Sequence, residues 1–314
     1  MIKVSILIPA FNRAQFLPDM LSSIARQEPF TEEIEWETWI IDNGSTDDTR
    51  ELVSDWSLRW PTLHLSYTFL PHPGLTNALN QGLELVTGDY VFLTDSDDFW
   101  DPKKLRMQLG ALRQAHGKTI AHTDLRVVNA DGTQIINPSL HFSRFHNKIS
   151  TRFEDILQRT NVWAGTVLLH RSAIRDLIPI PISLRTQDPW IALVGAFQER
   201  LVVVPHVLYN YRQHGNGQTL SLAKQRGSSV PGLFDHIELL TQFKTRYDDQ
   251  LNASQRDAVV HRLYWLKREL AILWPHANPP VPPEPSGNVA LKNRIRIRAG
   301  VAKRIFLARH LPWV

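Results

Sequence analysis

The sequence predicts an α/β fold, built on a mostly parallel sheet with helices on both faces and followed by a C-terminal helical extension. Through the first hundred residues, short apolar runs alternate with longer segments that have one apolar face. This alternation is typical of β-α-β units, whose strands run parallel. In addition, polar clusters follow three of the expected strands, at Asn12-Arg13, Asp42-Asn43 and Asp95-Asp98. Because ligands of such sheets bind beyond the carboxyl ends of the strands, these clusters predict a binding site.

The expected elements of the first half follow from the residue pattern. Apolar runs predict strands at residues 4–9, 36–41, 63–69 and 90–94. Apolar residues with helical spacing predict helices at residues 14–27, 45–56 and 75–86. A fourth helix is expected to begin at Asp101-Pro102, with the acid as its cap and proline in its first turn. Ser45 or Thr46 is expected to cap the second helix.

The second half has a more mixed pattern. The segment from Asn129 to Gly132 predicts a hairpin turn between strands at 120–128 and 134–136. Further strands are expected at 166–170 and 201–211, around a helix near 188–198. Helical patterns then cover about 234–247 and 254–274, and six prolines between Pro275 and Pro285 predict an extended linker.

Composition narrows the class of protein. The chain has 314 residues, of which 43% are hydrophobic, so it can bury a sizeable core. It has no cysteine, which excludes a disulfide framework and thiolate metal ligands. The first apolar run, from Val4 to Ala10, is too short for a signal segment, and no run approaches the roughly 20 apolar residues of a membrane span. We therefore expect a cytoplasmic protein.

The net charge of +4 is distributed unevenly. Seven of the 35 basic residues follow Glu284, where no acidic residue occurs, so the rest of the chain has 28 basic residues against 31 acidic ones. The body is therefore mildly acidic, and we expect no nucleic-acid binding by it. In the tail, Leu291, Ile295 and Ile305 share one helical face, which predicts a helix lying on an anionic membrane. An oligomer contact, a disordered basic arm and a nucleic-acid contact are the alternatives for this tail.

The segment Thr94-Asp95-Ser96-Asp97-Asp98 carries the strongest chemical signal. Three carboxylates within four positions repel each other, and hard cations such as Mn²⁺ or Mg²⁺ take oxygen ligands of this kind, often shared with substrate phosphates. The alternative is a solvated acidic turn before the next helix. The apolar flanks, Phe92-Leu93 and Phe99-Trp100, favour the metal-binding interpretation because a solvated turn does not need them.

Four segments together resemble family 2 of the inverting glycosyltransferases, which have the Rossmann-like GT-A fold. The matching segments, in the order and spacing of the family, are residues 4–13, 41–49, 74–80 and 88–102. The resemblance covers about residues 1–215 and is weaker after 115. It implies a catalytic domain at 1–225, with a nucleotide-sugar-binding half at 1–115 and an acceptor half at 116–225. A helical extension at 226–274, a proline-rich linker at 275–287 and a basic amphipathic tail at 288–314 complete the expected organisation.

The resemblance also implies roles for particular residues. Phe11 stacks on the nucleotide base and Asp42 accepts a hydrogen bond from it, although core packing and an Asx turn are the alternatives for these two. Asp97, with Asp95 and His214, would hold Mn²⁺ or Mg²⁺ against the diphosphate, although His214 in a polar loop is often only solvated. The expected nucleotide and donor contacts are Pro9, Ala10, Phe11, Asn12, Arg13, Asp42, Asn80, Asp95, Ser96 and Arg212.

The expected catalytic base is Asp188, at the start of a helix where relatives usually carry Glu-Asp. Inverting transfer needs one base to deprotonate the acceptor hydroxyl. The alternative is structural, with Asp188 as the helix N-cap before Pro189. The resemblance implies a nucleoside-diphosphate sugar as donor, with UDP as the expected nucleotide, and a hydroxyl of a glycan or lipid-linked acceptor.

Three departures from the family pattern keep other functions open. Asn43 stands where relatives often carry Asp, Gln187 replaces the usual Glu, and residues 74–80 lack the Lys or Arg that often occurs there. The metal and Arg13 would then supply more of the positive charge for the diphosphate, or Arg212 would contribute. A non-catalytic nucleotide-sugar-binding partner subunit is the main alternative. A sugar-phosphate nucleotidyltransferase is disfavoured because no glycine-rich basic loop follows the first strand.

Overall fold

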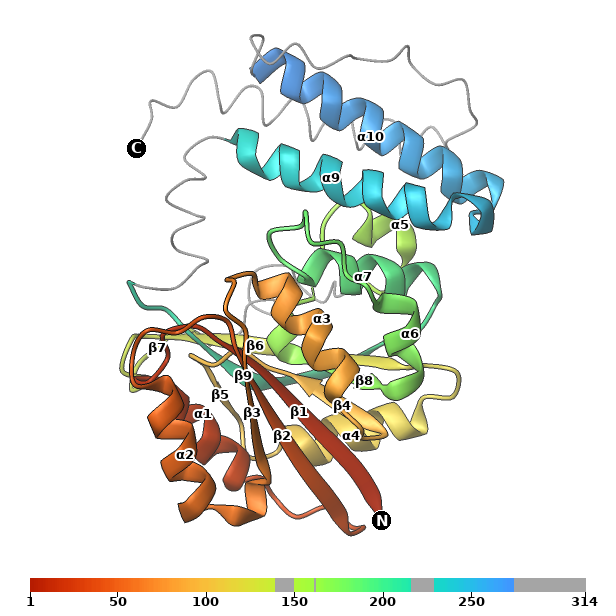
Figure 1. Ribbon diagram of the computed structural model, residues 1–314. Helices are drawn as coiled ribbons and strands as arrows, with labels where there is room; N and C mark the ends of the chain where they lie inside the picture. Colours follow the sequence, from red (N-terminus) through yellow and green to blue (C-terminus); the bar gives the residue numbers. More distant parts are fainter. Residues whose placement is uncertain (139–149, 161, 216–228, 274–314) are drawn as a thin grey trace. The chain divides into compact units, whose positions relative to one another are not determined.

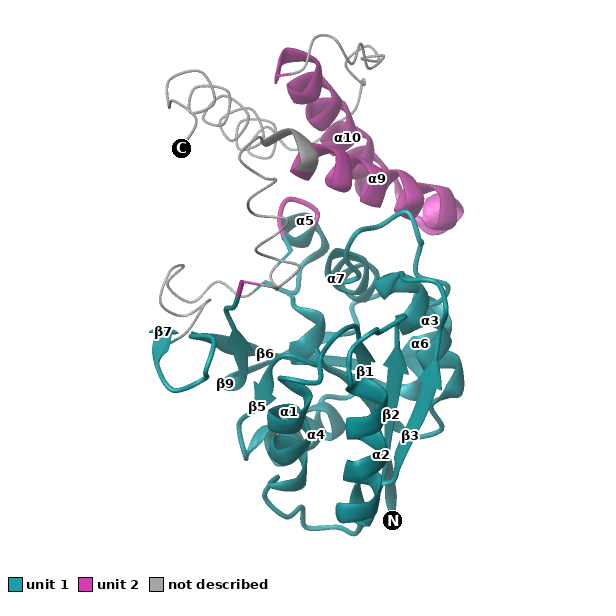
Figure 2. Cartoon of the chain, turned by 60° about the vertical axis from the view of Figure 1, so that its left-hand side comes forward, with its two compact units in different colours: residues 1–156, 160–214 teal, residues 157–159, 215–314 magenta. Residues whose placement is uncertain are grey.

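The structure is a computed structural model that describes residues 1–138, 150–160, 162–215 and 229–273 (Figure 1). The chain divides into two compact units, one of residues 1–156 and 160–214 and the other of residues 157–159 and 215–314 (Figure 2). The first unit has the predicted α/β architecture. Its boundary at residue 214 falls earlier than the expected end of the catalytic domain at 225, and residues 216–225 lie outside the described residues.

The strands and helices of the first unit follow the predicted alternation. The strands are β1 (Ile2–Ala10), β2 (Ile34–Asp42), β3 (Leu65–Phe69), β4 (Tyr90–Leu93), β5 (Phe99–Trp100), β6 (Ile120–Val128), β7 (Ile135–Asn137), β8 (Val167–His170) and β9 (Leu201–Arg212). The helices are α1 (Leu17–Ala25), α2 (Thr49–Arg59), α3 (Leu75–Leu85), α4 (Lys104–Gln114), α5 (Phe153–Ile156), α6 (Ile174–Leu177) and α7 (Asp188–Phe197).

One sheet joins these strands in the order β3-β2-β1-β4-β8-β6-β9-β5, with β7 paired to β6. The first four strands are parallel, as the sequence predicts. From β8 onward the directions are mixed, because β8 runs antiparallel to both β4 and β6, while β9 runs parallel to β6. The expected parallel arrangement therefore holds for β3, β2, β1 and β4 and for the β6–β9 pair, while the pairs made by β8 are antiparallel.

Helices cover both faces of the parallel part of the sheet. Ile6 and Ile8 of β1 pack in one core cluster with Leu21 of α1 and Leu109 of α4. Leu7 points to the opposite face, where α3 approaches so closely that a Cβ at Gly82 would lie 2.3 Å from Leu7 Cδ1. Because successive side chains of a strand alternate between the faces of a sheet, β1 is buried from both sides. This burial fixes the carboxyl end of β1, where Asn12 and Arg13 follow.

The predicted helix caps are wrong. The second helix has Asp48 at its N-cap and the fourth has Lys103, and neither cap side chain bonds to its own helix. Instead, Asp101 accepts a hydrogen bond from the Lys103 amide (3.1 Å) and pairs with Arg126 (3.1 Å), which delays the start of α4. Local cap patterns failed here because loop contacts across the sheet compete with helix capping for the same polar side chains.

The second unit contains two helices within its described part, α9 (Ser229–Tyr247) and α10 (Ala253–Leu273), as expected for the helical extension. Their packing buries Leu240 and Phe243 of α9 and Leu266 of α10. The predicted linker at 275–287 and basic tail at 288–314 lie outside the described residues. Among the helices described in either unit, none is long and apolar enough to cross a membrane.

Candidate active site

The loops that follow β1 and β2 are tied together at the carboxyl end of the sheet. The Asn12 amide donates to Ser45 Oγ (2.9 Å), and Asn12 Oδ1 accepts from the Thr46 amide (2.8 Å). Asn12 has a φ of 53°, a left-handed conformation that asparagine adopts more readily than most residues. The polar cluster after β1 is therefore held in one conformation by the neighbouring loop.

Asp97, in the loop after β4, lies between two basic side chains. Its Oδ2 is 3.1 Å from both Arg13 Nε and Arg13 Nη2, and 3.1 Å from His214 Nε2. Burial raises the pKa of the Asp97 carboxyl, but the hydrogen bond with His214 and the charge of Arg13 outweigh burial and hold the pKa below its usual value. The structure thus brings together Arg13, Asp97 and His214, predicted from three separate segments, around an ionised carboxylate.

The two acids on either side of Asp97 have raised pKa values. Burial raises the pKa of Asp95 to about 8, and the charges of Asp97 and Asp188 add to the effect. Asp98 is fully buried, and burial together with Asp97 and Asp95 raises its pKa well above the usual value. Asp98 Oδ1 accepts from the Arg212 amide (2.7 Å), while Oδ2 has no hydrogen-bond partner within the described chain. Asp97 is therefore the acid of this loop whose charge is stabilised, whereas the charged forms of Asp95 and Asp98 are disfavoured.

Asp188 is the first residue of α7 and belongs to the same site, since its charge raises the pKa of Asp95. Its Oδ1 accepts from the Ala164 amide (3.0 Å). The N-cap position is Gln187, so the alternative of Asp188 as a simple cap is wrong. Burial raises the pKa of Asp188 to about 6. The hydrogen-bond partner of Asp188 is a neutral amide, whereas that of Asp97 is a guanidinium.

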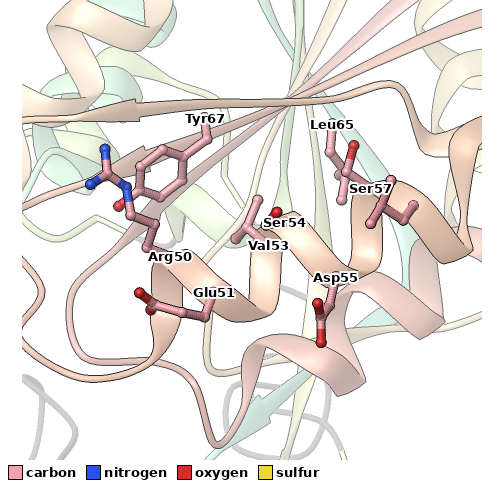
Figure 3. Close-up of a pocket in the computed structure, with 9 residues that line it drawn as sticks. Arg50, Glu51, Val53, Ser54, Asp55, Ser57, Leu65 and Tyr67 are labelled. Carbon is pink, nitrogen blue, oxygen red and sulfur yellow. The ribbon is translucent and has the colours of Figure 1, made fainter.

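Asp42 ends β2 and is fully buried. Its Oδ1 accepts from the Ser45 amide (2.7 Å) and its Oδ2 accepts from Tyr67 Oη (2.7 Å). Burial and the hydrogen bond to Asp42 raise the pKa of Tyr67, which keeps its hydroxyl protonated as a donor. Tyr67 also lines a pocket of about 640 Å³ between α2 and β3, where the guanidinium of Arg50 lies 5.6 Å from the centre of its ring (Figure 3). No predicted site residue lines this pocket, but Tyr67 connects it to Asp42.

Comparison with known proteins identifies the family. The family model described as "Glycosyl transferase family 2" matches residues 5–178, which is more than half of the chain. The chain belongs to this family. Among curated relatives, the candidate teichuronic acid biosynthesis glycosyltransferase TuaG of Bacillus subtilis is 28% identical over 194 residues, which cover 61% of this chain and 71% of TuaG. The protein is accordingly a glycosyltransferase.

Solved structures identify the fold of this glycosyltransferase as GT-A. S. aureus TarS 1–349 in complex with UDP-GlcNAc superposes with a TM-score of 0.64 at 18% identity, covering 98% of this chain and 81% of TarS 1–349. The mannosyltransferase PcManGT of Pyrobaculum calidifontis, in complex with GDP-Man and Mn²⁺, gives a TM-score of 0.58 at 17% identity, covering 98% of this chain and 85% of PcManGT. At these identities the likeness establishes the architecture alone.

Two residues expected to contact the donor make extensive contacts within the glycosyltransferase itself. The buried guanidinium of Arg212 donates to Asp97 O (2.9 Å), to Ala130 O (2.9 Å) and to Asp19 Oδ2 (2.6 Å). The Asn80 carboxamide forms hydrogen bonds with the backbone amide and carbonyl of Ile180. Arg13, rather than Arg212, is therefore the guanidinium that contacts the Asp97 carboxylate.

The remaining predicted donor contacts lie at the ends of β1 and β4. Pro9 and Ala10 are buried where β1 ends, and Ser96 is buried between Asp95 and Asp97. Phe11 is 39% exposed, so its ring is not a core residue and remains accessible for stacking. The structure thus disfavours core packing, the alternative weighed for Phe11.

Two of the departures from the family pattern have defined positions in the structure. Asn43 Oδ1 accepts from the Gly74 amide (2.6 Å), so this side chain holds the N-terminus of α3. Gln187 is buried, and its Oε1 has no hydrogen-bond partner among the described residues. Replacing the usual acid with an amide at 187 leaves Asp188 as the single carboxylate at the start of α7.

Two further residues that the sequence did not single out support the acidic loop. Tyr209 of β9 accepts from the Asp95 amide through its hydroxyl (3.1 Å), and Gly165 lies so close that a Cβ there would be 2.3 Å from this hydroxyl. Lys104 is fully buried, with its Nζ between 5.3 and 5.5 Å from the ring centres of Phe92, Trp100 and Tyr209. The lysine is the first residue of α4, and no local motif predicts its contacts with these rings.

The glycosyltransferase has some of the ligands that a divalent cation needs. In the ranges that the structure describes, no group of three or more His, Cys, Asp or Glu side chains is arranged to hold a metal ion by itself. However, Asp97 Oδ2 and His214 Nε2 converge at 3.1 Å, with Asp95 in the same loop. Mg²⁺ is commonly bound by one or two carboxylates and completed by water and substrate phosphates. Asp97 and His214 therefore supply at most a partial ligand set, which water and a diphosphate would have to complete.

Proposed function

We propose that this glycosyltransferase transfers a sugar from a uridine-diphosphate sugar to a hydroxyl of a glycan or lipid-linked acceptor, with inversion and with assistance from Mn²⁺ or Mg²⁺. One observation carries the proposal: two acids of the same site have opposite environments. Asp97 is held ionised by Arg13 and His214, whereas burial raises the pKa of Asp188 to about 6. Environments that separate the pKa values of neighbouring acids are typical of sites that divide binding and acid–base roles between them.

Asp188 is the proposed general base. In inverting transfer, the acceptor oxygen forms a bond to the anomeric carbon while the bond from that carbon to the diphosphate oxygen breaks. The acceptor proton passes to the Asp188 carboxylate. A pKa of about 6 suits this role, because the group is ionised at neutral pH and more basic than an ordinary aspartate. The hydrogen bond from the Ala164 amide fixes one carboxylate oxygen and so orients the group.

The donor is proposed to bind along the loops after β1, β2 and β4. The exposed ring of Phe11 offers a stacking face for the base, and Asp42 supplies the acceptor for a base N–H. Arg13 lies where it can contribute positive charge beside the diphosphate. A divalent cation held by Asp97 and His214 would neutralise the negative charge of the departing diphosphate. A glycan acceptor is supported by TuaG, the relative named for teichuronic acid biosynthesis.

A donor screen tests this function. Nucleotide sugars with different bases and sugars are first ranked by thermal stabilisation of the protein in the presence of Mn²⁺, because a ligand of the native state raises stability by mass action. Transfer from the best donor to glycan acceptors is then followed by nuclear magnetic resonance, which reports the anomeric configuration of the product. We expect a UDP-sugar to rank first and the configuration to invert. A product with retained configuration would refute the single-base mechanism.

The basic tail is proposed to hold the enzyme at the inner face of the cytoplasmic membrane. This proposal rests on the sequence, in which seven basic residues and no acidic ones follow Glu284. Each Lys or Arg near an anionic surface contributes about 1 kcal/mol, so seven could retain the domain there. A chain ending at residue 287 should no longer co-float with phosphatidylserine-containing vesicles and should hydrolyse the donor at the full-length rate. Absence of the full-length protein from the vesicle fraction at low salt would exclude this role.

A further inference from the structure

The segment between α6 and α7, which leads to Asp188, is held by a side chain of α3. Asn80 Oδ1 accepts from the Ile180 amide (2.8 Å), and Asn80 Nδ2 donates to the Ile180 carbonyl (2.9 Å). One carboxamide therefore binds both backbone groups of one residue, 100 positions away in the sequence. Ile180 itself is fully buried. Two hydrogen bonds from a planar group fix orientation as well as position, which a single bond does not.

A second side chain of the same helix holds the same segment nearer to Asp188. Thr76 is buried, and its Oγ1 donates to the Leu184 carbonyl (3.1 Å). Thr76 and Asn80 are four residues apart and so lie on one face of α3. Leu184 precedes Asp188 by four residues. The two side chains therefore fix two points along the backbone that enters α7.

Helix α3 is itself firmly placed in the nucleotide-binding half. Its close approach to β1 at Gly82, described above, leaves no room for a side chain between them. Its N-terminus is held by Asn43, the residue after Asp42, through the Gly74 amide (2.6 Å). A helix fixed at both of these points is a suitable support for a catalytic group on another segment, because displacements of about 1 Å at a reacting group can cost a hundredfold in rate.

We infer that Asn80, together with Thr76, is a positioning residue for Asp188 and does not contact the donor. The inference deepens the proposed function, since it rests on Asp188 as the base. Both hydrogen-bonding ends of the Asn80 carboxamide are engaged by the protein backbone, which is a sufficient reason for its presence. The contact also connects the half of the sheet that binds the nucleotide to the helix that begins with the base.

The test compares Asn80→Ala and Thr76→Val with Gln81→Ala, an exposed amide on the same helix as the matched control. For each, kcat, KM for the donor and the dissociation constant of UDP are measured, with thermal unfolding to confirm that the variant is folded. We expect Asn80→Ala to lower kcat about ten- to a hundredfold, with UDP affinity within twofold of wild type. Thr76→Val, which removes one hydrogen bond and keeps the shape, should lower kcat less. Gln81→Ala should change none of the three constants.

A double-mutant cycle with Asp188→Asn separates this inference from the proposed function. If Asn80 acts through Asp188, Asn80→Ala should cause no further loss of rate in the Asp188→Asn background. Weakened UDP or donor binding with an unchanged kcat would overturn the inference and restore Asn80 as a donor contact. Wild-type values of both constants in Asn80→Ala and Thr76→Val would also overturn it. A wild-type rate for Asp188→Asn alone would instead refute the proposed base.

Discussion

Asp97 and Asp188 lie in one site but in opposite surroundings. Asp97 is bonded to a guanidinium and an imidazole, both provided by loops at the carboxyl end of the sheet. Asp188 is bonded to a neutral backbone amide at the start of a helix. The first environment stabilises the charged carboxylate, whereas at Asp188 burial outweighs the hydrogen bond from the Ala164 amide and disfavours the charge.

This difference teaches that residue type alone does not assign a role to a carboxylate. An acid that is already ionised is suited to hold a cation, and a diphosphate only through that cation. An acid whose charge is disfavoured by burial binds a proton more readily and is suited to accept one from a substrate. Variants of the two acids test whether these two environments account for two different functions.

Replacing the proposed base, Asp188, should have the largest effect on kcat. Asp188→Asn keeps the size of the side chain and its acceptor for the Ala164 amide, but the amide cannot take a proton. We expect kcat to fall about 10²–10⁴-fold, with little change in UDP affinity. Asp55→Asn, on the exposed face of α2, serves as the control and should leave both unchanged. A near-normal rate in Asp188→Asn would move the base elsewhere, and Asp98 would be tested next.

Removing the charge of Asp97 should abolish the contribution of Mn²⁺ to UDP binding. In wild type, UDP at about 100 times its dissociation constant should stabilise the fold by about 2.7 kcal/mol when Mn²⁺ is present, and chelator should reduce this stabilisation. In Asp97→Asn, we expect Mn²⁺ to add no stabilisation and transfer to be lost. Thermal unfolding with UDP, with and without Mn²⁺, measures this. Full transfer in the presence of chelator would contradict the metal assignment.

The pH dependence of the reaction should report Asp188. Because the base must be unprotonated and its pKa is raised to about 6, kcat should fall about tenfold between pH 7 and pH 5 and level off above pH 7. The contribution of Asp188 to the free energy of unfolding should change in the opposite direction to kcat and decrease as pH rises. A raised folded pKa stabilises the fold fully below the pKa of the unfolded chain, and this contribution is lost as pH rises through about 6.

Asp188→Asn should consequently become more stable relative to wild type as pH rises from 4 to 7, by up to about 3 kcal/mol. Urea unfolding at the two pH values measures the difference. If the difference in free energy of unfolding between Asp188→Asn and wild type were the same at pH 4 and pH 7, the environment of Asp188 would not disfavour its charge.

The smallest effect on catalysis is expected at Asp42, the third acid of interest. Tyr67→Phe removes the donor to Asp42 Oδ2 and leaves a buried carboxylate oxygen without that partner. We expect the free energy of unfolding to fall by about 1–3 kcal/mol and UDP to bind more weakly, with kcat at saturating donor unchanged. Calorimetric titration and urea unfolding check this. A fall in kcat with normal UDP affinity would mean that Asp42 acts on the chemical step.

Much of the parallel half of the fold could be predicted from sequence because its signals are local. The strand ending at Ala10 and the helix at Leu75–Leu85 have apolar spacings that only one element type satisfies. The mixed half could not be predicted in the same way. The direction of β8 relative to β4 depends on how the chain returns to the sheet, and no residue in Val167–His170 encodes it.

In the site, too, the features encoded locally could be predicted and the long-range contacts could not. The acids Asp42, Asp95 and Asp97 could be named because they follow strand ends, and a sheet edge brings such positions together. The contacts of Arg212 and Asn80 could not be predicted. Asn80 meets Ile180 across 100 residues, and the contacts of Arg212 with Asp19 span 193, so no local pattern carries this information.

The sequence by itself determined the parallel half of the sheet, the family and the identity of the acids, because strand ends and short motifs are encoded by neighbouring residues. Only the tertiary structure decided the environment of each acid. Burial and the approach of Arg13 and His214 separate Asp97 from Asp188, and both depend on segments distant in the sequence. The physical reason is that the pKa of a carboxyl depends on desolvation and on charges within a few ångströms, which the fold alone brings into place.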